Sequence, residues 1–232
     1  HNIMITKLTK TLLGVLAGSC MLSSCSSGNH LSMVSDEGVA KVKELVRANV
    51  DSTQNKIYRL EWQEDDRDRK LDNLLSTINI SYIDKNNNDF SLTIHLEDGE
   101  FVVDEPIKSK RQLHAYEQST PIDLNKIDAA YLQKVGTEAD ELFCTQNEEG
   151  DQYEVKSVER FCFRTDPVSL DRVDLWERDE EYRAEHQITK LTFELNYTKK
   201  GETPETKGRA VWTNYYTVPF VVNEQGEVTF DE

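Results

Sequence analysis

The chain has 232 residues and a formal net charge of −16, with 43 acidic residues against 27 basic ones. Nucleic-acid binding needs clustered Lys and Arg side chains that neutralise phosphates, so this charge argues against a nucleic acid as the partner. The length suffices for one large or two small domains. Charged residues make up 30% of the chain and hydrophobic residues 37%, which is typical of a globular protein with a strongly hydrated surface.

The first segment with a clear pattern is residues 7–25. Lys7 and Lys10 precede a short apolar run that ends in small residues and a cysteine, which is the layout of a secretory signal. This run is shorter than the roughly 20 apolar residues that span a bilayer. Its end, Leu22-Ser23-Ser24-Cys25, resembles the lipobox of bacterial lipoproteins, in which a leucine and two small residues precede the lipidated cysteine.

The resemblance implies that residues 1–24 are a signal peptide and that Cys25 carries the acyl chains, such as palmitate. Cys20 is an alternative lipidation site, although no leucine stands three residues before it. More than one acyl chain gives stable anchoring, whereas a single chain binds only marginally. The resemblance also implies the outer membrane, because Ser26 rather than Asp follows Cys25. No acidic run for export to the cell surface follows, which favours an anchor that faces the periplasm.

Residues 25–35 are expected to form a lipidated, flexible tether. Residues 36–105 are expected to form a first unit of one helix and an antiparallel sheet. Ser35 or Asp36 can cap the first amide groups of the helix. Its apolar residues recur at helical spacing, at Val39, Val42, Val46 and Val50.

The strands of the first unit follow from alternation of apolar and polar residues. In residues 56–62, alternation puts Ile57 and Arg59 on one face and Tyr58, Leu60 and Trp62 on the other. A charged loop over residues 63–73 comes next, followed by strands over residues 77–82 and 90–97. The turn between these two strands is predicted at residues 85–88, because asparagine tolerates left-handed backbone angles.

Residues 106–122 are interpreted as a linker, and residues 123–232 as a second unit of the same kind. Its helix is expected from about Asp123 to Phe143. Alternation then predicts five strands, over Tyr153 to Arg164, Arg172 to Trp176, Gln187 to Thr198, Arg209 to Val222 and Glu227 to Phe230.

The two predicted units resemble each other in sequence. Trp62 is followed by acidic residues and then by a strand that contains Tyr82, and Trp176 is followed in the same way by a strand that contains Tyr197, with nearly the same spacing from tryptophan to tyrosine. The fold class is therefore predicted to be α+β, with two helix-plus-antiparallel-sheet units related by tandem duplication. The alternative is that two unrelated amphipathic strands look alike.

The predicted order of elements resembles the tandem units of PepSY-type domains and of the β-lactamase-inhibitor-protein fold. It is also similar to that of many uncharacterised lipoproteins of Bacteroidetes. The resemblance covers roughly residues 36–230 and includes no diagnostic motif. It implies non-catalytic binding or inhibition in the periplasm.

Catalytic and metal motifs are not found in the sequence. The histidines of the folded part, His95, His114 and His186, fall in different predicted elements, and no Gly-x-Ser-x-Gly or His-Glu-x-x-His motif occurs. Residues 84–89 resemble the start of a calcium loop but lack its sixth-position glycine and its later glutamate, so a turn is favoured. No cofactor or metal is expected, and the acidic runs 61–72 and 177–185 are interpreted as solvated loops.

Six other residues are candidates for structural or binding roles. Cys144 and Cys162 would form a disulfide in an oxidising compartment, or would remain two separate thiols, because their spacing does not show that they meet. Aromatic side chains near acidic loops could bind a sugar or a peptide, or could simply pack in the core. These candidates are Trp62, Trp176, Trp212 and Tyr215.

The sequence therefore predicts a lipid-anchored envelope protein that binds an envelope protein or peptide without catalysis. One alternative is a structural or accessory subunit of an outer-membrane complex, and another is a hydrolase with an unrecognised site. The exposed faces and edges of the sheets are the expected docking surfaces.

Overall fold

A computed structural model of the chain describes residues 30–232. The predicted signal peptide, the lipobox and both candidate lipidation sites, Cys20 and Cys25, lie outside these residues. The described part consists of helices and a large antiparallel sheet, which confirms the α+β class.

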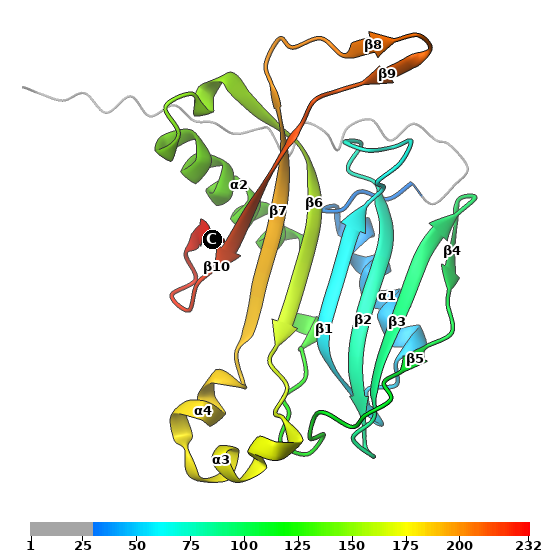
Figure 1. Cartoon of the computed structure of the whole chain (residues 1–232), viewed down its shortest axis with the longest axis vertical. Coiled ribbons are helices and arrows are strands. Elements are labelled where there is room, and N and C mark those ends of the chain that lie inside the picture. The colour runs from blue at the N-terminus through cyan, green and yellow to red at the C-terminus, as the bar shows by residue number, and fades with distance from the viewer. Residues whose placement is uncertain (1–29) are drawn as a thin grey trace, which may run out of the picture.

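The elements fall into two successive groups (Figure 1). The first comprises α1 (Asp36–Asn49), β1 (Asn55–Glu64), β2 (Leu75–Asp84), β3 (Asp89–Glu97), β4 (Glu100–Val103) and β5 (Ile107–Lys108). The second comprises α2 (Ala129–Gln146), β6 (Tyr153–Thr165), α3 (Val173–Arg178), α4 (Glu180–Glu185), β7 (Thr189–Lys199), β8 (Glu205–Lys207), β9 (Ala210–Trp212), β10 (Tyr216–Val222) and β11 (Val228–Phe230).

Both groups contribute to one nine-stranded antiparallel sheet, in the order β11-β10-β7-β6-β1-β2-β3-β4, with β5 also paired to β3. The two groups meet where β1 pairs with β6, from Arg59 opposite Arg164 to Gln63 opposite Arg160. From this centre each group runs outward through successive neighbouring strands. Tandem duplication of the two groups remains a prediction.

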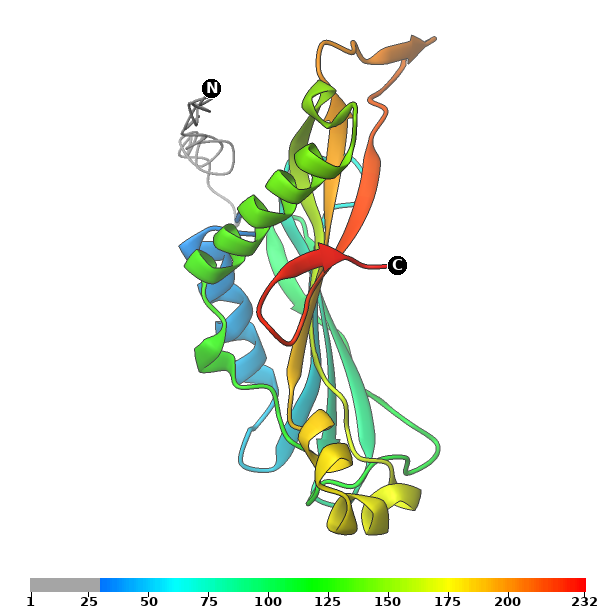
Figure 2. The same cartoon turned by 90° about the vertical axis from the view of Figure 1, so that its left-hand side faces the viewer.

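Helices α1 and α2 lie on the same face of the sheet (Figure 2). As predicted, α1 begins after Ser35, whose Oγ accepts a hydrogen bond of 3.0 Å from the Gly38 amide. The predicted apolar stripe of α1 is buried against the sheet, at Val39, Val42, Val46 and Val50. Helix α2 begins later than predicted, at Ala129, because Asp128 accepts a hydrogen bond from the Tyr131 amide and caps it.

A ladder of aromatic side chains crosses the sheet beneath the helices. Its members are paired directly across neighbouring strands, and their ring centroids lie 5.3 to 6.0 Å apart. Such offset aromatic pairs stabilise a core beyond their area burial. The ladder consists of Trp62, Phe161, Phe193, Phe220 and Phe230.

A bulge in β1 changes which residues face the core. Ile57 pairs with Tyr82, but Arg59 pairs with the adjacent Ser81, so Tyr58 is an extra residue on its strand. Ile57 therefore lies on the same face as Leu60 and is 6% exposed. Simple alternation placed Ile57 opposite Leu60, and that prediction is wrong because the bulge resets the alternation.

The fold begins earlier in the chain than predicted. The Leu31 carbonyl accepts a hydrogen bond of 2.7 Å from the Leu75 amide, and Ser32 forms a bridge with Leu74. Met33 and Val34 are 0% and 2% exposed. The predicted tether of residues 25–35 is therefore too long, because its apolar residues belong to the core.

Two further strand predictions need correction. The segment predicted as a strand around Trp176 is instead α3, and Asp179 follows it as the cap of α4, accepting hydrogen bonds from two backbone amides. The single strand predicted for residues 209–222 is divided into β9 and β10.

The segment predicted as a linker, residues 106–122, is packed onto the sheet. Strand β5 pairs with β3, and the Ile122 amide donates a hydrogen bond of 2.8 Å to the Ile57 carbonyl.

Candidate functional site

Figure 2 shows α1 and α2 on one face of the sheet, and we call the opposite face the helix-free face. Most of the side chains on it are polar. Successive residues of a strand point to opposite faces, so this face is formed by the neighbours of the core residues. One row of paired residues crosses six strands on it, and four of the six are half-buried. The row consists of Val221, Thr192, Cys162, Glu61, Asn79 and Thr93.

Charged side chains at the centre of the helix-free face form an ion-pair ladder. Arg59 contacts Glu61 at 2.7 Å, and Arg160 contacts Glu61 at 3.7 Å and Glu194 at 3.2 Å. Glu61 is buried, although the acidic run that contains it was expected to be a solvated loop. The ladder pairs two arginines with two glutamates, so this part of the face carries little net charge.

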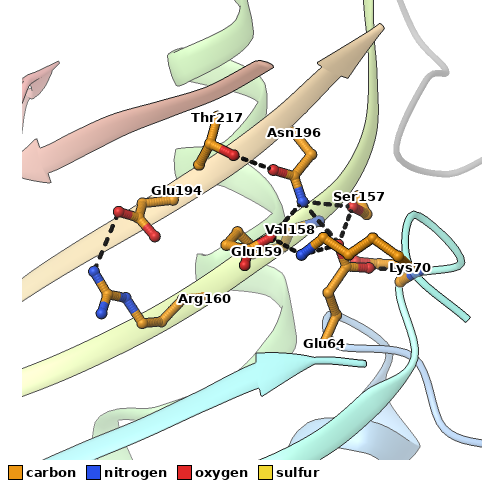
Figure 3. Close-up of polar contacts among 10 residues, drawn as sticks. Glu64, Lys70, Ser157, Val158, Glu159, Arg160, Glu194, Asn196 and Thr217 are labelled. Atoms are coloured by element: carbon orange, nitrogen blue, oxygen red, sulfur yellow. Dashed lines mark hydrogen bonds and ion pairs between the residues drawn. The ribbon is translucent and has the colours of Figure 1, made fainter. Parts of the chain in front are cut away.

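A second polar cluster, the Glu64 network, lies nearer the end of the sheet (Figure 3). The side chain of Glu64 is completely buried and accepts hydrogen bonds from the Ser157 hydroxyl at 2.6 Å and the Asn196 amide at 2.7 Å. Asn196 also donates to Glu159 at 2.7 Å and accepts from the Thr217 hydroxyl at 2.7 Å. The network therefore connects β1, β6, β7 and β10.

Lys70 supplies the positive charge of the Glu64 network. Its ammonium lies 3.5 Å from Glu64 and is paired directly with Glu159. Burial raises the pKa of Glu64, while the hydrogen bond from Ser157 and the charge of Lys70 act in the opposite direction. Lys70 also lies 5.4 Å from the centre of the Tyr215 ring. The loop between β1 and β2 is thereby attached to the segment that leads into β10.

The Glu64 network was not expected from the sequence. Its cation comes from a segment interpreted as a solvated loop, and its acceptor is one glutamate in an acidic run. The Ser157 hydroxyl donates a hydrogen bond to Glu64 and Ser157 is only 2% exposed, so this hydroxyl is not accessible to a substrate as a nucleophile. The arrangement connects strands and a loop, which is a structural role.

The aromatic candidates for ligand binding are not brought together. Trp62 is 0% exposed, and its indole donates to the Met33 carbonyl at 3.2 Å, so it belongs to the core. Trp176 lies on α3, and the guanidinium group of Arg183, on α4, is 5.5 Å from the centre of its ring. Trp212 and Tyr215 are 39% and 41% exposed and lie on and just after β9.

The histidines of the folded part also lie apart. His95 contacts Glu97 and Asp104, and His186 stacks on Tyr182. His114 contacts buried Asp89 at 2.6 Å.

Tyr58 lies beside the His114 ring, and burial together with the Asp89 charge raises the pKa of Tyr58 to about 12. This contact attaches the segment after β5 to the sheet. This group of side chains does not contain the serine or cysteine nucleophile beside a base that an acyl-transfer site requires.

Cys144 and Cys162 are both free thiols. Cys144 is an exposed residue of α2, whereas Cys162 is 8% exposed and belongs to the helix-free face. Their positions correspond to the alternative of two separate thiols.

Two sizeable hollows lie on the helix-covered side of the sheet. One, of about 690 Å³, lies between the start of α2, β7 and the β10–β11 turn. The other, of about 800 Å³, lies between the end of α1 and residues 120–125. Neither is lined by a tryptophan.

Comparison of the chain with family models, with curated proteins and with solved structures finds no match. The resemblance to lipoproteins and to tandem helix-on-sheet units therefore remains a prediction. Within residues 30–232, no helix has the length and apolar character needed to cross a bilayer. The same residues contain no group of three or more acidic, histidine or cysteine side chains arranged to hold a metal ion.

Proposed function

We propose that the protein is a bacterial lipoprotein, anchored through Cys25 to the outer membrane with its folded part in the periplasm. We propose that it binds an envelope protein or peptide there without catalysing a reaction. The lipobox-like residues 22–25 support the anchor, and the strongly acidic composition supports a body that is hydrated rather than laid flat on anionic lipid.

The observation that carries the binding proposal is the helix-free face. It is a broad surface formed by six neighbouring strands, and no helix of residues 30–232 lies on it. Small ligands usually bind in concave pockets, whereas both hollows described above lie on the other side of the sheet. A broad polar surface whose charges are already paired suits hydrogen bonding to an extended polypeptide surface.

Site-directed photo-cross-linking in cells that naturally make the protein tests this proposal. The cross-linking amino acid is placed at Thr93 or Thr192 on the helix-free face, and at Lys134 on the outer side of α2 as the control. The Lys134 side chain is 69% exposed, so it is more accessible than the half-buried Thr93 and Thr192.

We expect one discrete protein or peptide adduct from Thr93 or Thr192 and none from Lys134. The same adduct at equal yield from Lys134, or no adduct from either face position, would overturn the proposal. An antiparallel sheet can expose one face to water without a partner. The test is therefore the difference in adduct yield between Thr93 or Thr192 and Lys134.

A further inference from the structure

Between β7 and β10 the chain leaves the main sheet and forms a separate two-stranded hairpin, β8–β9. Its strands pair only with each other, from Glu205 opposite Trp212 to Lys207 opposite Ala210. The hairpin projects beyond the ends of β6 and β7 (Figure 1). It therefore contributes little to the core, and its side chains need another explanation.

The hairpin and the residues after it expose large apolar and aromatic side chains. Val211 is 68% exposed, Trp212 is 39%, Tyr215 is 41% and Tyr216 is 53%. The Trp212 indole donates to Glu205 over 3.1 Å. Tryptophan and tyrosine are enriched where a protein meets the headgroup region of a bilayer, because one part of each ring is apolar and another is polar.

The charge of this segment is opposite to that of the rest of the chain. Residues 199–216 contain four basic side chains and two acidic ones, whereas the whole chain has a net charge of −16. Lys207 is the last residue of β8 before the turn of the hairpin, and Arg209 lies in the turn. Basic residues beside exposed aromatic rings favour contact with anionic lipid headgroups.

The hairpin lies at the end of the sheet where the chain enters the fold. Leu31 is fixed to Leu75 at the start of β2. Strand registers place Glu64, Ser157 and Asn196 near that same end, close to where β7 leads into the hairpin. Figures 1 and 2 show the hairpin extending past the end of the sheet at which the described part of the chain begins.

The length of chain between the lipidation site and the fold is short. Cys25 precedes Leu31 by six residues, which span at most about 20 Å when fully extended. An acylated Cys25 therefore keeps this end of the sheet within that distance of the lipid surface, and the hairpin is the part of the end that projects farthest.

We propose that the β8–β9 hairpin contacts the membrane surface, with Val211 and Trp212 among the lipid headgroups and Lys207 and Arg209 beside lipid phosphates. The acidic body remains in water, so the protein is oriented by its acyl chains and this one hairpin together. The inference rests on the proposed anchor at Cys25, and it adds an orientation that the anchor alone does not impose.

The test uses the full acylated protein in vesicles of phosphatidylglycerol and brominated phosphatidylcholine, because bromine quenches the fluorescence of a nearby tryptophan. The protein is compared with Trp212→Phe, which retains the two other tryptophans, Trp62 and Trp176. Co-sedimentation with the vesicles measures the anchor separately, and Cys25→Ala is its negative control.

We expect brominated lipid to quench the wild-type protein and to quench Trp212→Phe much less. Replacing both Lys207 and Arg209 by Glu should reduce the quenching several-fold without changing co-sedimentation. The matched control Lys134→Glu, on the exposed side of α2, should leave the quenching unchanged.

Co-sedimentation without any quenching of Trp212 would overturn the hairpin proposal and leave the anchor intact. Failure of the wild-type protein to co-sediment would overturn both. A hairpin that is unquenched in vesicles but cross-links to one protein from Trp212 in cells would show that its partner is a protein instead of lipid.

Discussion

Trp62 and Glu61 are neighbours in β1, yet they belong to the two different faces of one sheet. Trp62 starts an aromatic ladder that is sealed beneath α1 and α2. Glu61 is part of an ion-pair ladder on the helix-free face. Apolar burial is non-directional and adds up over the contacts, whereas buried ion pairs gain little net stability once desolvation is counted. The helix-covered face therefore supplies most of the stability of the fold, and in the proposed function the helix-free face contacts the partner.

Truncation of Trp62 should give the largest difference between the faces. Trp62→Ala removes a fully buried ring at the start of the aromatic ladder, and we expect a loss of about 3 to 5 kcal/mol in the free energy of unfolding. Trp212→Ala removes the same side chain from the exposed hairpin and should cost about 0.5 kcal/mol or less. Urea unfolding of the wild-type protein and both variants measures these changes in the free energy of unfolding. Equal losses would contradict the assignment of the core.

Removal of Lys70 should have the next largest effect. Lys70→Met leaves buried Glu64 without its cation, and we expect a loss of roughly 3 kcal/mol near neutral pH. Thr217→Val is the control, because it removes one hydrogen bond of the same network without removing a charge.

The effect of Lys70→Met should also depend on pH. Burial raises the pKa of Glu64 above its ordinary value of 4.5, so the folded state holds this proton more tightly than the unfolded chain. Stability therefore falls as pH rises through this range. Loss of Lys70 raises the pKa of Glu64 further, so the difference between variant and wild type should widen with rising pH and close in acid. A difference that is constant between pH 3 and roughly 7 would contradict this role of Glu64.

A substitution on the helix-free face away from both polar clusters should have a smaller effect than removal of Lys70. Thr93 donates a hydrogen bond of 2.9 Å to Asn79, and both side chains are half-buried, so water can replace the lost contact. Thr93→Val should change the free energy of unfolding by about 1 kcal/mol or less. Leu92→Ala, one residue earlier on the covered face, should cost about 2 to 5 kcal/mol. If the two costs were similar, the faces would not differ as described.

The elements that the sequence predicts correctly are those fixed by local chemistry. Ser35 caps α1 through its own side chain. The turn between β2 and β3 forms because Asp84 accepts hydrogen bonds from the Asn86 and Asn88 amides and Asn87 adopts a positive φ. Neither feature needs a partner that is distant in the sequence.

The features that the sequence does not predict depend on distant partners. The bulge at Tyr58 is set by pairing with β2. Glu64 is buried because Ser157 and Asn196 come from strands about 90 and 130 residues further on. Trp176 is an exception, because it lies on α3 and its nearby cap residue is local: Asp179 caps α4 from within an acidic run that the sequence predicts as a loop. Composition shows that such a run is charged, but not which of its members becomes buried.

Acylation of Cys25 is the claim on which the location, the envelope partner and the membrane contact of the hairpin all depend. Mass spectrometry of the protein extracted from the membrane fraction of its natural host tests it most directly. We predict a mature chain that begins at Cys25 and carries acyl chains on that residue. A protein that retains residues 1–24, or that is recovered without lipid from the soluble fraction, would contradict this account.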